Sequence, residues 1–587
     1  MKSFFKIFFA SFFALIVFSV IAFFIGIWAI GALMAPSKPE IGSKGVLVVD
    51  LNATYNEQSK DNPLSSLTSD ESSNVIGLYD VVRMIHYAET DTAIKGIYIN
   101  GGYDPNGFAT NEELRTAISD FKASRKFVIA YGETMDQKSY YVSSVADQVF
   151  CHPNGGIEWD GFSVTLLFMK GLLDKLGIEP EVFYAGKFKS ATEPFRVTKM
   201  TDANRIQTTD LLNDLYGNCL QQIAEARNTD TATLHQYAQN GLIRTASDAI
   251  KYHLVDGLKY DDQVKSLLQK KLGLKPAEEV NFIAFSKYAK AVDYKNSSSD
   301  SKIAIIYAQG DIVSGKSNDD EIGSDDFIKI IRKARLDKDV KAIVFRVNSP
   351  GGSSLASDGI WREITLAKKN KPVVVSMGDY AASGGYYISC NADSIFADKG
   401  TVTGSIGVFS MLANLEPFFN NKLGITFDGV KTAPYADMGT PTRPLTEQEK
   451  MFLQSSVDTI YNTFKERVAS GRNADPNFID SIAQGHVYSG NRAISLKLVD
   501  RTGTLQDAVD CAARMAKLDV FRTKEYPEKK SFLQELLSGS SFNASVRENT
   551  VKEKIGADQY FMLQQVNKIK ELMNSPQARM PFDLNIH

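Results

Sequence analysis

The chain has 587 residues, of which 43% are hydrophobic and 23% charged, close to the averages for folded globular proteins. This composition excludes a disordered, collagen-like or coiled-coil protein, and a net charge of −3 provides no basic field to hold nucleic acid. The four cysteines and six histidines form no C-x-x-C pair and no H-x-x-H or H-E-x-x-H cluster. We therefore expect no disulfide scaffold, no metal and, without a G-x-x-x-x-G-K-[ST] loop, no nucleotide cofactor.

Residues 1–36 have the pattern of a cytoplasmic stub followed by a transmembrane anchor. Ile7–Met34 holds 28 residues without a charge, whereas about 20 apolar residues cross a bilayer and a signal-peptide core is shorter. Lys2 and Lys6 precede this run, which predicts that the N-terminus stays in the cytoplasm and that the rest of the chain lies outside it. We expect a single-pass protein of the inner (cytoplasmic) membrane; small residues near Ala35 leave a cleaved signal as the alternative.

The chain resembles itself at a fixed offset of 246 residues. KGIYINGG at Lys95 resembles KAIVFRVN at Lys341, and YYVSSVADQVF at Tyr140 resembles YYISCNADSIF at Tyr386. One offset held over this length indicates two related domains. The predicted parts are the anchor (1–36), an N-terminal repeat (45–295), a polar linker (Asn296–Ser301), a C-terminal repeat (302–523) and a C-terminal helical tail (524–587), in which Ala557–Met573 has the pattern of an amphipathic helix.

Apolar runs alternate with helical patterns in both repeats. Val46–Leu51, Phe127–Tyr131 and Ala342–Val347 are typical of buried strands, and Asp325–Asp337 and Gly359–Asn370 are typical of helices. This alternation predicts an α/β fold with largely parallel strands.

The two copies differ after corresponding strands. After Ala342–Val347 the second copy reads NSPGGSS, and the paired glycines Gly351 and Gly352 would let backbone N–H groups approach a ligand closely, as an oxyanion hole requires. After Val373–Met377 it reads GDYAASGGYYIS, in which small residues frame Ser383. Each motif alone is more often structural. Together they make Ser383, which follows a strand and opens a helix, a candidate nucleophile.

A nucleophilic serine needs a base, and in the sequence no histidine accompanies these motifs. The first copy instead contains YAGKFKSATEPF, which places Lys187 and Lys189 among small and apolar residues. Lys189 lies 52 residues after Gln137, the counterpart of Ser383 in the first copy. We interpret this as one repeat keeping the serine and the other the lysine, although spacing alone leaves a surface lysine as the alternative. Burial, helped by the charge of Lys187, would lower the pKa of Lys189 as a base requires.

Three segments resemble the signal peptide peptidase A (protease IV) family of membrane-anchored Ser/Lys peptidases, and the resemblance covers nearly the whole chain. They are RVNSPGGS at Arg346, AASGGYYIS at Ala381 with TGSIGV at Thr403, and GKFKSATEPF at Gly186. The long form of this family is a tandem repeat whose fold is similar to Clp protease and crotonase. The resemblance implies that Ser383 is the nucleophile, Lys189 the base, Ser405 a residue that orients the lysine amine, and Gly351 and Gly352 the oxyanion hole.

The resemblance also implies a function. The expected protein is a membrane-anchored serine endopeptidase that degrades cleaved signal peptides and other unfolded or membrane-associated peptides, without a cofactor. A homo-oligomer, a tetramer by family resemblance, would enclose the sites. Ser349, Ser353 and Ser354 are expected to shape the glycine loop rather than to react. The alternatives are a crotonase-like acyl-CoA enzyme, which would need neither Ser383 nor Lys189, and a non-catalytic membrane scaffold.

Overall fold

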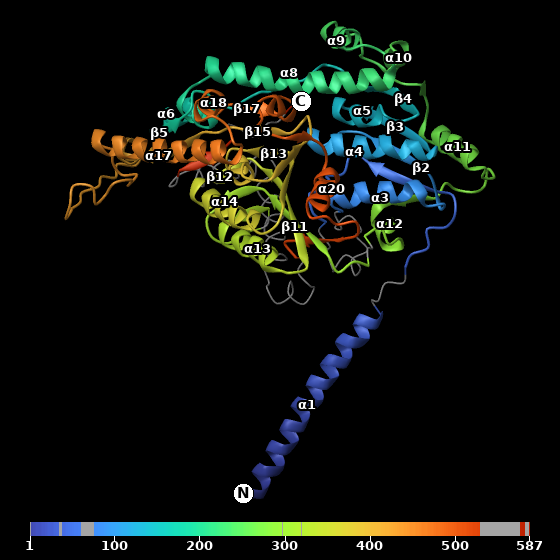
Figure 1. Ribbon diagram of the computed structural model, residues 1–587, viewed down its shortest axis with the longest axis horizontal. Helices are drawn as coiled ribbons and strands as arrows, with labels where there is room; N and C mark the ends of the chain where they lie inside the picture. The colour runs from blue at the N-terminus through green and yellow to red at the C-terminus, as the bar shows by residue number, and fades with distance from the viewer. Residues whose placement is uncertain are drawn as a thin grey trace.

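The computed structural model describes residues 2–33, 38–59, 76–295, 298–318, 320–528, 576–580 and 586 (Figure 1). Its first element, α1 (Lys2–Leu33), is a long helix that projects away from the body. The stretch Phe4–Ala22 has a mean hydropathy of 2.4, is long enough to cross a membrane and is not buried against the rest of the chain. This arrangement fits a membrane-anchored protein.

Six parallel strands form the sheet of the first half, in the order β6-β4-β3-β2-β1-β7. Their bounds are β1 (Gly45–Asp50), β2 (Ile94–Gly101), β3 (Phe127–Met135), β4 (Gln148–Ile157), β6 (Gly257–Leu258) and β7 (Phe282–Ala284). The helices α3 (Leu78–Thr90), α4 (Phe108–Phe121) and α5 (Gln137–Ser143) pack in the core on one face, and α11 (Asp261–Leu272) covers the other. The first half is therefore a three-layered α/β unit.

The second half repeats this topology. Its sheet contains six parallel strands in the corresponding order β18-β14-β13-β11-β8-β19. Their bounds are β8 (Lys302–Gln309), β11 (Val340–Ser349), β13 (Val373–Ala382), β14 (Ser394–Ala397), β18 (Arg501–Thr502) and β19 (Arg522–Tyr526), with β15 (Val402–Gly404) and β17 (Val487–Ser489) added at the end of β13. The shared strand order agrees with the predicted tandem α/β repeats.

Helices also cover both faces of the second sheet. The bounds are α13 (Ser324–Leu336), α14 (Ser354–Lys368), α15 (Gly384–Ser389) and α17 (Glu447–Gly471) on one side, and α20 (Leu505–Met515) on the other. The long helix α8 (Asp202–Arg227) runs across both halves and contacts α5 in the first and β17 in the second (Figure 1).

A third sheet joins the halves. Its order is β10-β9-β12-β20-β16-β5. The bounds are β5 (Glu179–Ala185) from the first half, β9 (Asp311–Val313), β10 (Glu321–Gly323), β12 (Gly351–Ser353) and β16 (Val408–Asn414) from the second, and β20 (Gln577–Arg579) from the C-terminus. Because β5 pairs antiparallel with the whole of β16, the segment that follows β5 is carried onto the second half.

Two elements differ from the sequence prediction. Helix α14 begins at Ser354, five residues before the predicted start at Gly359, because the Ser353 hydroxyl caps it by accepting the Ala356 N–H. The described parts of the predicted helical tail are strands, β19 beside β8 and β20 beside β12. Strand β20 is only three residues long and is stabilised by strands that are distant in the sequence, so no local sequence pattern predicts it. The predicted helix Ala557–Met573 lies outside the described residues.

Candidate active site

Ser383 lies between the end of β13 and the first turn of α15. Its side chain is fully buried, and its backbone has φ 55° and ψ −111°, a conformation that a residue with a side chain rarely adopts. The Ser383 N–H donates to the Gly404 carbonyl at 2.8 Å, which holds this turn against β15. The strand-to-helix turn therefore presents the hydroxyl at the carboxyl end of the central strand.

Lys189 reaches this hydroxyl from the other half of the chain. It follows β5, its side chain is 1% exposed, and its Nζ lies 2.8 Å from Ser383 Oγ. Burial lowers the pKa of the Lys189 ammonium well below 10.5. Lys187, whose charge the sequence predicted to help, is exposed, and its ammonium lies 5.4 Å from the Phe188 ring centre. Desolvation is thus the cause of the lowered pKa.

Ser405 supplies two further contacts to the lysine. Lys189 Nζ lies 3.0 Å from Ser405 Oγ and 3.2 Å from the Ser405 carbonyl oxygen. Ser405 itself has φ 50°, and its N–H donates to the His486 carbonyl at 2.7 Å. With Ser383 Oγ, these oxygens surround the nitrogen and fix its direction.

The glycine loop is built differently from the expectation that both amides are free. Gly351 and Gly352 have φ of 103° and 153°, conformations in the region that favours glycine. However, the Gly351 N–H donates to Ser349 Oγ at 3.1 Å, so it is engaged within the loop. Besides the Gly352 amide, a second amide lies near the serine. It belongs to Gly384, the first residue of α15, whose N–H has no partner within its own helix. The sequence pattern missed this residue.

The C-terminal strand β20 lies beside the serine, in the position between β12 and β16 that we call the cleft. It pairs antiparallel with β12, with Ala578 opposite Gly352, and bridges to β16 on its other side. The Ala578 carbonyl oxygen lies so close that a Cβ on Gly351 would approach it to 2.1 Å, and a Cβ on Gly384 to 3.0 Å. Only glycine at the first position leaves room for this carbonyl.

The rival hydroxyls have structural partners. Ser349 Oγ accepts the Gly351 N–H, Ser353 caps α14, and the Ser354 hydroxyl donates to the Pro576 carbonyl at 3.0 Å. These contacts agree with the expectation that the three serines shape the loop.

A segment that no motif indicated completes the site. Gly485 packs against the backbone of Lys189, where a Cβ would lie 2.7 Å from the Lys189 nitrogen, and the Phe188 N–H donates to the Gln484 carbonyl at 2.7 Å. The next residue, His486, holds Ser405 through its backbone, while its ring lies against Phe188 and Tyr488. Burial lowers the pKa of this imidazole. A glycine and a histidine about 80 residues after Ser405 give no local signal of this role.

Arg346 of the RVNSPGGS segment anchors the loop to the first half. Its buried guanidinium lies 2.7 Å from carboxylate oxygens of both Glu57 and Glu113. Asn348 donates to Glu57 at 2.8 Å and accepts the Tyr380 N–H at 3.0 Å. Two residues of the motif thereby position the glycine loop rather than react.

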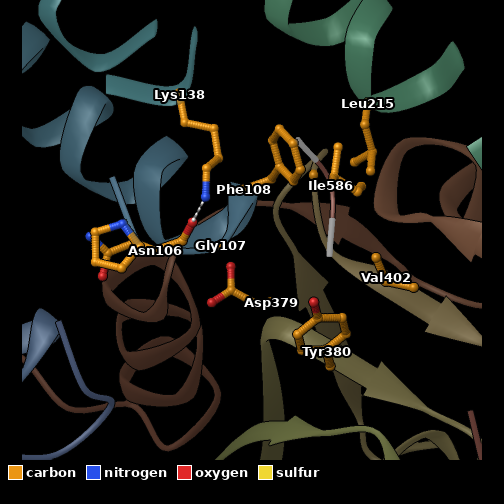
Figure 2. Close-up of a pocket in the computed structure, with 11 residues that line it drawn as sticks. Asn106, Gly107, Phe108, Lys138, Leu215, Asp379, Tyr380, Val402 and Ile586 are labelled. Atoms are coloured by element: carbon orange, nitrogen blue, oxygen red, sulfur yellow. Dashed lines mark hydrogen bonds between the residues drawn. The ribbon is translucent and has the colours of Figure 1, made fainter. Parts of the chain in front are cut away.

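A cavity of about 260 Å³ lies between the two halves, beside the first-repeat counterpart of the glycine loop (Figure 2). Asn106, the counterpart of Gly352, lines it, and Lys138 reaches across to donate to the Asn106 carbonyl at 3.0 Å. Asp379 and Tyr380 of the second half face it (Figure 2). In the first repeat, Asn106 and Lys138 therefore occupy the place that the glycine loop and the first turn of α15 occupy in the second.

Comparisons with known proteins agree with this division. The model of "Peptidase family S49" matches the chain twice, at residues 120–275 and 365–519. Protease 4 of Salmonella typhi is 35% identical, with 89% of this chain and 86% of that protein covered. Serine protease SPPA, chloroplastic, of Arabidopsis thaliana is 31% identical, with 79% and 70% covered.

Among solved structures, a mutant of ClpP1 from Listeria monocytogenes matches 35% of this chain and 94% of its own, at 14% identity and a TM-score of 0.24. The family match and the identity to the two proteases over most of their length favour a peptidase over an acyl-CoA enzyme or a scaffold. This chain belongs to Peptidase family S49 and is a serine peptidase with a tandem repeat.

Proposed function

We propose that Ser383 and Lys189 form the catalytic dyad of this peptidase. The observation that carries the proposal is the 2.8 Å separation between two buried side chains, 194 residues apart, in a cleft that already holds an extended chain. The neutral amine of Lys189 takes the hydroxyl proton while Oγ attacks a peptide carbonyl, and it passes the proton to the departing amine. Water then cleaves the acyl-serine with the same lysine as base.

The backbone supplies the electrostatic part of the reaction. The N–H groups of Gly352 and Gly384 are placed to donate to the oxyanion that forms on the attacked carbonyl. Ser405 is proposed to keep the lysine nitrogen directed at the nucleophile, and Gly351 to leave room for the carbonyl.

The substrate class follows from the cleft and the anchor. Strands β12 and β16 bind an extended chain, β20, between them, as they would bind an extended peptide, and α1 would hold the site close to a membrane. We therefore propose remnant signal peptides and other unfolded, membrane-associated peptides as substrates. The catalytic halves would lie on the extracytoplasmic side of the inner membrane, and the chain would act as a homo-oligomer, a tetramer by family resemblance.

The test compares three single variants of the full-length protein in detergent on an unfolded protein and on a signal peptide. Ser383→Ala should abolish cleavage and labelling by a serine-reactive phosphonate. Lys189→Met should lower kcat/KM by about 10²–10⁴-fold, the usual contribution of a general base. Lys187→Met, an exposed lysine two positions away, is the matched control and should retain activity. Unchanged cleavage by Ser383→Ala or Lys189→Met contradicts the dyad.

The pH profile gives a second readout. Because burial lowers the pKa of Lys189, the fraction of neutral amine is already substantial below pH 10.5, and kcat/KM should rise with pH to an inflection well below that value. An inflection at the pKa of an exposed lysine would contradict a desolvated base.

A further inference from the structure

The strand β20 lies where a peptide substrate would lie if the proposed function holds. It runs antiparallel to β12, the Met580 N–H donates to the Pro350 carbonyl at 2.7 Å, and the Ser354 N–H donates to the Pro576 carbonyl at 3.3 Å. The Ala578 carbonyl oxygen lies against Gly351 and Gly384, the backbone next to the nucleophile. With the Gly352 and Gly384 amides as the proposed oxyanion hole, the Ala578–Arg579 peptide bond corresponds to the cleaved bond, and the residues after it correspond to the departing half of a substrate.

The first residue after that bond meets a carboxylate. Arg579 Nη1 lies 2.6 Å from Asp311 Oδ2, and the two side chains are only 14% and 27% exposed. Asp311 begins β9, a strand of the same sheet as β12, so its position is fixed by backbone hydrogen bonds rather than by a flexible loop. An ion pair of this partly covered kind is stronger than an exposed one.

The second residue enters an apolar cluster. Successive side chains of an extended chain point to opposite faces, so Met580 is directed away from Asp311. Met580 is 4% exposed. The cluster around it consists of Leu211, Leu215, Ala382, Val402 and Val487. Ala382 immediately precedes Ser383, so this cluster adjoins the nucleophile.

We infer that Asp311 and this apolar cluster are specificity subsites for the first and second residues that follow the cleaved bond. They select a basic residue at the first position and a large apolar residue at the second. The inference rests on the proposed peptidase mechanism and adds a preference on the departing side of the substrate. Leu211 and Leu215 of this cluster lie on α8 in the first half, so both halves would contribute to the preference for an apolar second residue.

The test uses quenched fluorescent peptides that share the sequence around Pro-Gln-Ala and differ only after it. Pairs of peptides with Arg-Met and Glu-Met compete for the full-length protein in detergent, and mass spectrometry locates the cut. The Arg/Glu ratio of kcat/KM should be about tenfold or more for the unaltered protein, the value of one such ion pair. Because β20 competes equally with both peptides, the ratio is independent of how often it occupies the cleft.

Two substitutions of Asp311 then distinguish a change in substrate preference from a loss of folded protein. Asp311→Asn should bring the Arg/Glu ratio close to one, and Asp311→Lys should reverse it. Asp325→Asn, an exposed aspartate in the first turn of α13, is the matched control and should keep the original ratio. A ratio measured within one variant does not depend on the fraction of folded enzyme.

The apolar subsite is tested with Arg-Met and Arg-Ser peptides. The Met/Ser ratio should be about tenfold or more, and Leu215→Ala should lower it without changing the Arg/Glu ratio. Cleavage after the alanine with ratios near one, or ratios that Asp311→Lys and Leu215→Ala leave unchanged, overturns the inference and leaves the peptidase in place. Failure to cleave any of the peptides or an unfolded protein overturns the proposed function instead.

Discussion

Ser383 carries its hydroxyl on a strained backbone. A non-glycine residue at φ 55° and ψ −111° costs of order 1–3 kcal/mol, and the hydrogen bond to Gly404 and the packing of α15 hold it there. Such strain is typical of functional sites, because the turn aims the side chain at the reacting group rather than minimising the backbone energy.

We expect Ser383→Gly to be more stable than Ser383→Ala, although both lack the hydroxyl. Glycine relieves the strain and loses more entropy on folding, so a net gain of about 1–2 kcal/mol remains. The measurement is thermal melting of both full-length variants in the same detergent. Equal melting temperatures would show that the turn is unstrained.

Lys189 makes the stability of the protein depend on pH. Its pKa in the folded state is lowered by burial, so between that value and 10.5 the unfolded chain binds more protons than the folded one. Stability contributed at this site therefore rises with pH across that window, and is lowest where the buried amine must be charged.

We expect Lys189→Met to melt at a higher temperature than the unaltered protein near neutral pH, with a difference that shrinks as the pH approaches 10.5. Methionine keeps the apolar stem and removes the titration. Melting curves of both proteins at several pH values measure this difference. A difference that is constant with pH would mean that Lys189 titrates alike in both states.

At the scale of elements, β20 determines how accessible the cleft is. It fills the position between β12 and β16 that we assign to a substrate, and Ala578 is fully buried there. A tethered strand lowers the apparent affinity for a free peptide in proportion to the fraction of molecules in which the cleft is occupied.

We therefore expect a chain that ends at residue 575 to have a lower KM for extended peptides, by about tenfold if the strand is bound nine-tenths of the time, with kcat little changed. In the full chain, Arg579→Glu should move KM in the same direction because it repels Asp311. Steady-state kinetics on one peptide measures both. An unchanged KM in the truncated chain would show that β20 does not compete with substrate.

The elements that the sequence predicted best are those with local patterns. The apolar runs at Phe127–Tyr131 and Ala342–Val347 lie within β3 and β11, because a strand buried on both faces needs apolar residues at every position. By contrast, β5 is half exposed and is a strand because β16 lies beside it, and β20 is three residues long and is a strand because it pairs with β12. Pairing across such distances leaves no mark in a short window of sequence.

At the scale of the molecule, buried charge joins the two halves. Arg346 from the second sheet lies between Glu57 and Glu113 from the first half, and all three side chains are at most 5% exposed. A buried charge that loses its partner is costly, whereas an exposed ion pair contributes little.

We expect Arg346→Met to destabilise the protein by about 3–5 kcal/mol, since two carboxylates lose their cation. Burial already raises the pKa of Glu113 to about 7 against the opposing effect of Arg346, so the deficit should be smaller at pH 5, where protonation removes a charge. Thermal melting at the two pH values measures this. Arg244→Ala, which breaks a pair with Asp160 that is 60% exposed on each side, is the control and should cost less than about 1 kcal/mol.

The sequence by itself determined the tandem α/β repeats, the apolar N-terminal helix and the residue types of the candidate site, because periodic apolar runs, an internal repeat and glycine-framed motifs are local features. Only the tertiary structure decided that Lys189 reaches Ser383 through the pairing of β5 with β16, that the Gly351 amide is engaged within its own loop, and that the C-terminus lies in the cleft. These relations join residues up to 235 positions apart, and they arise from the packing of one half on the other.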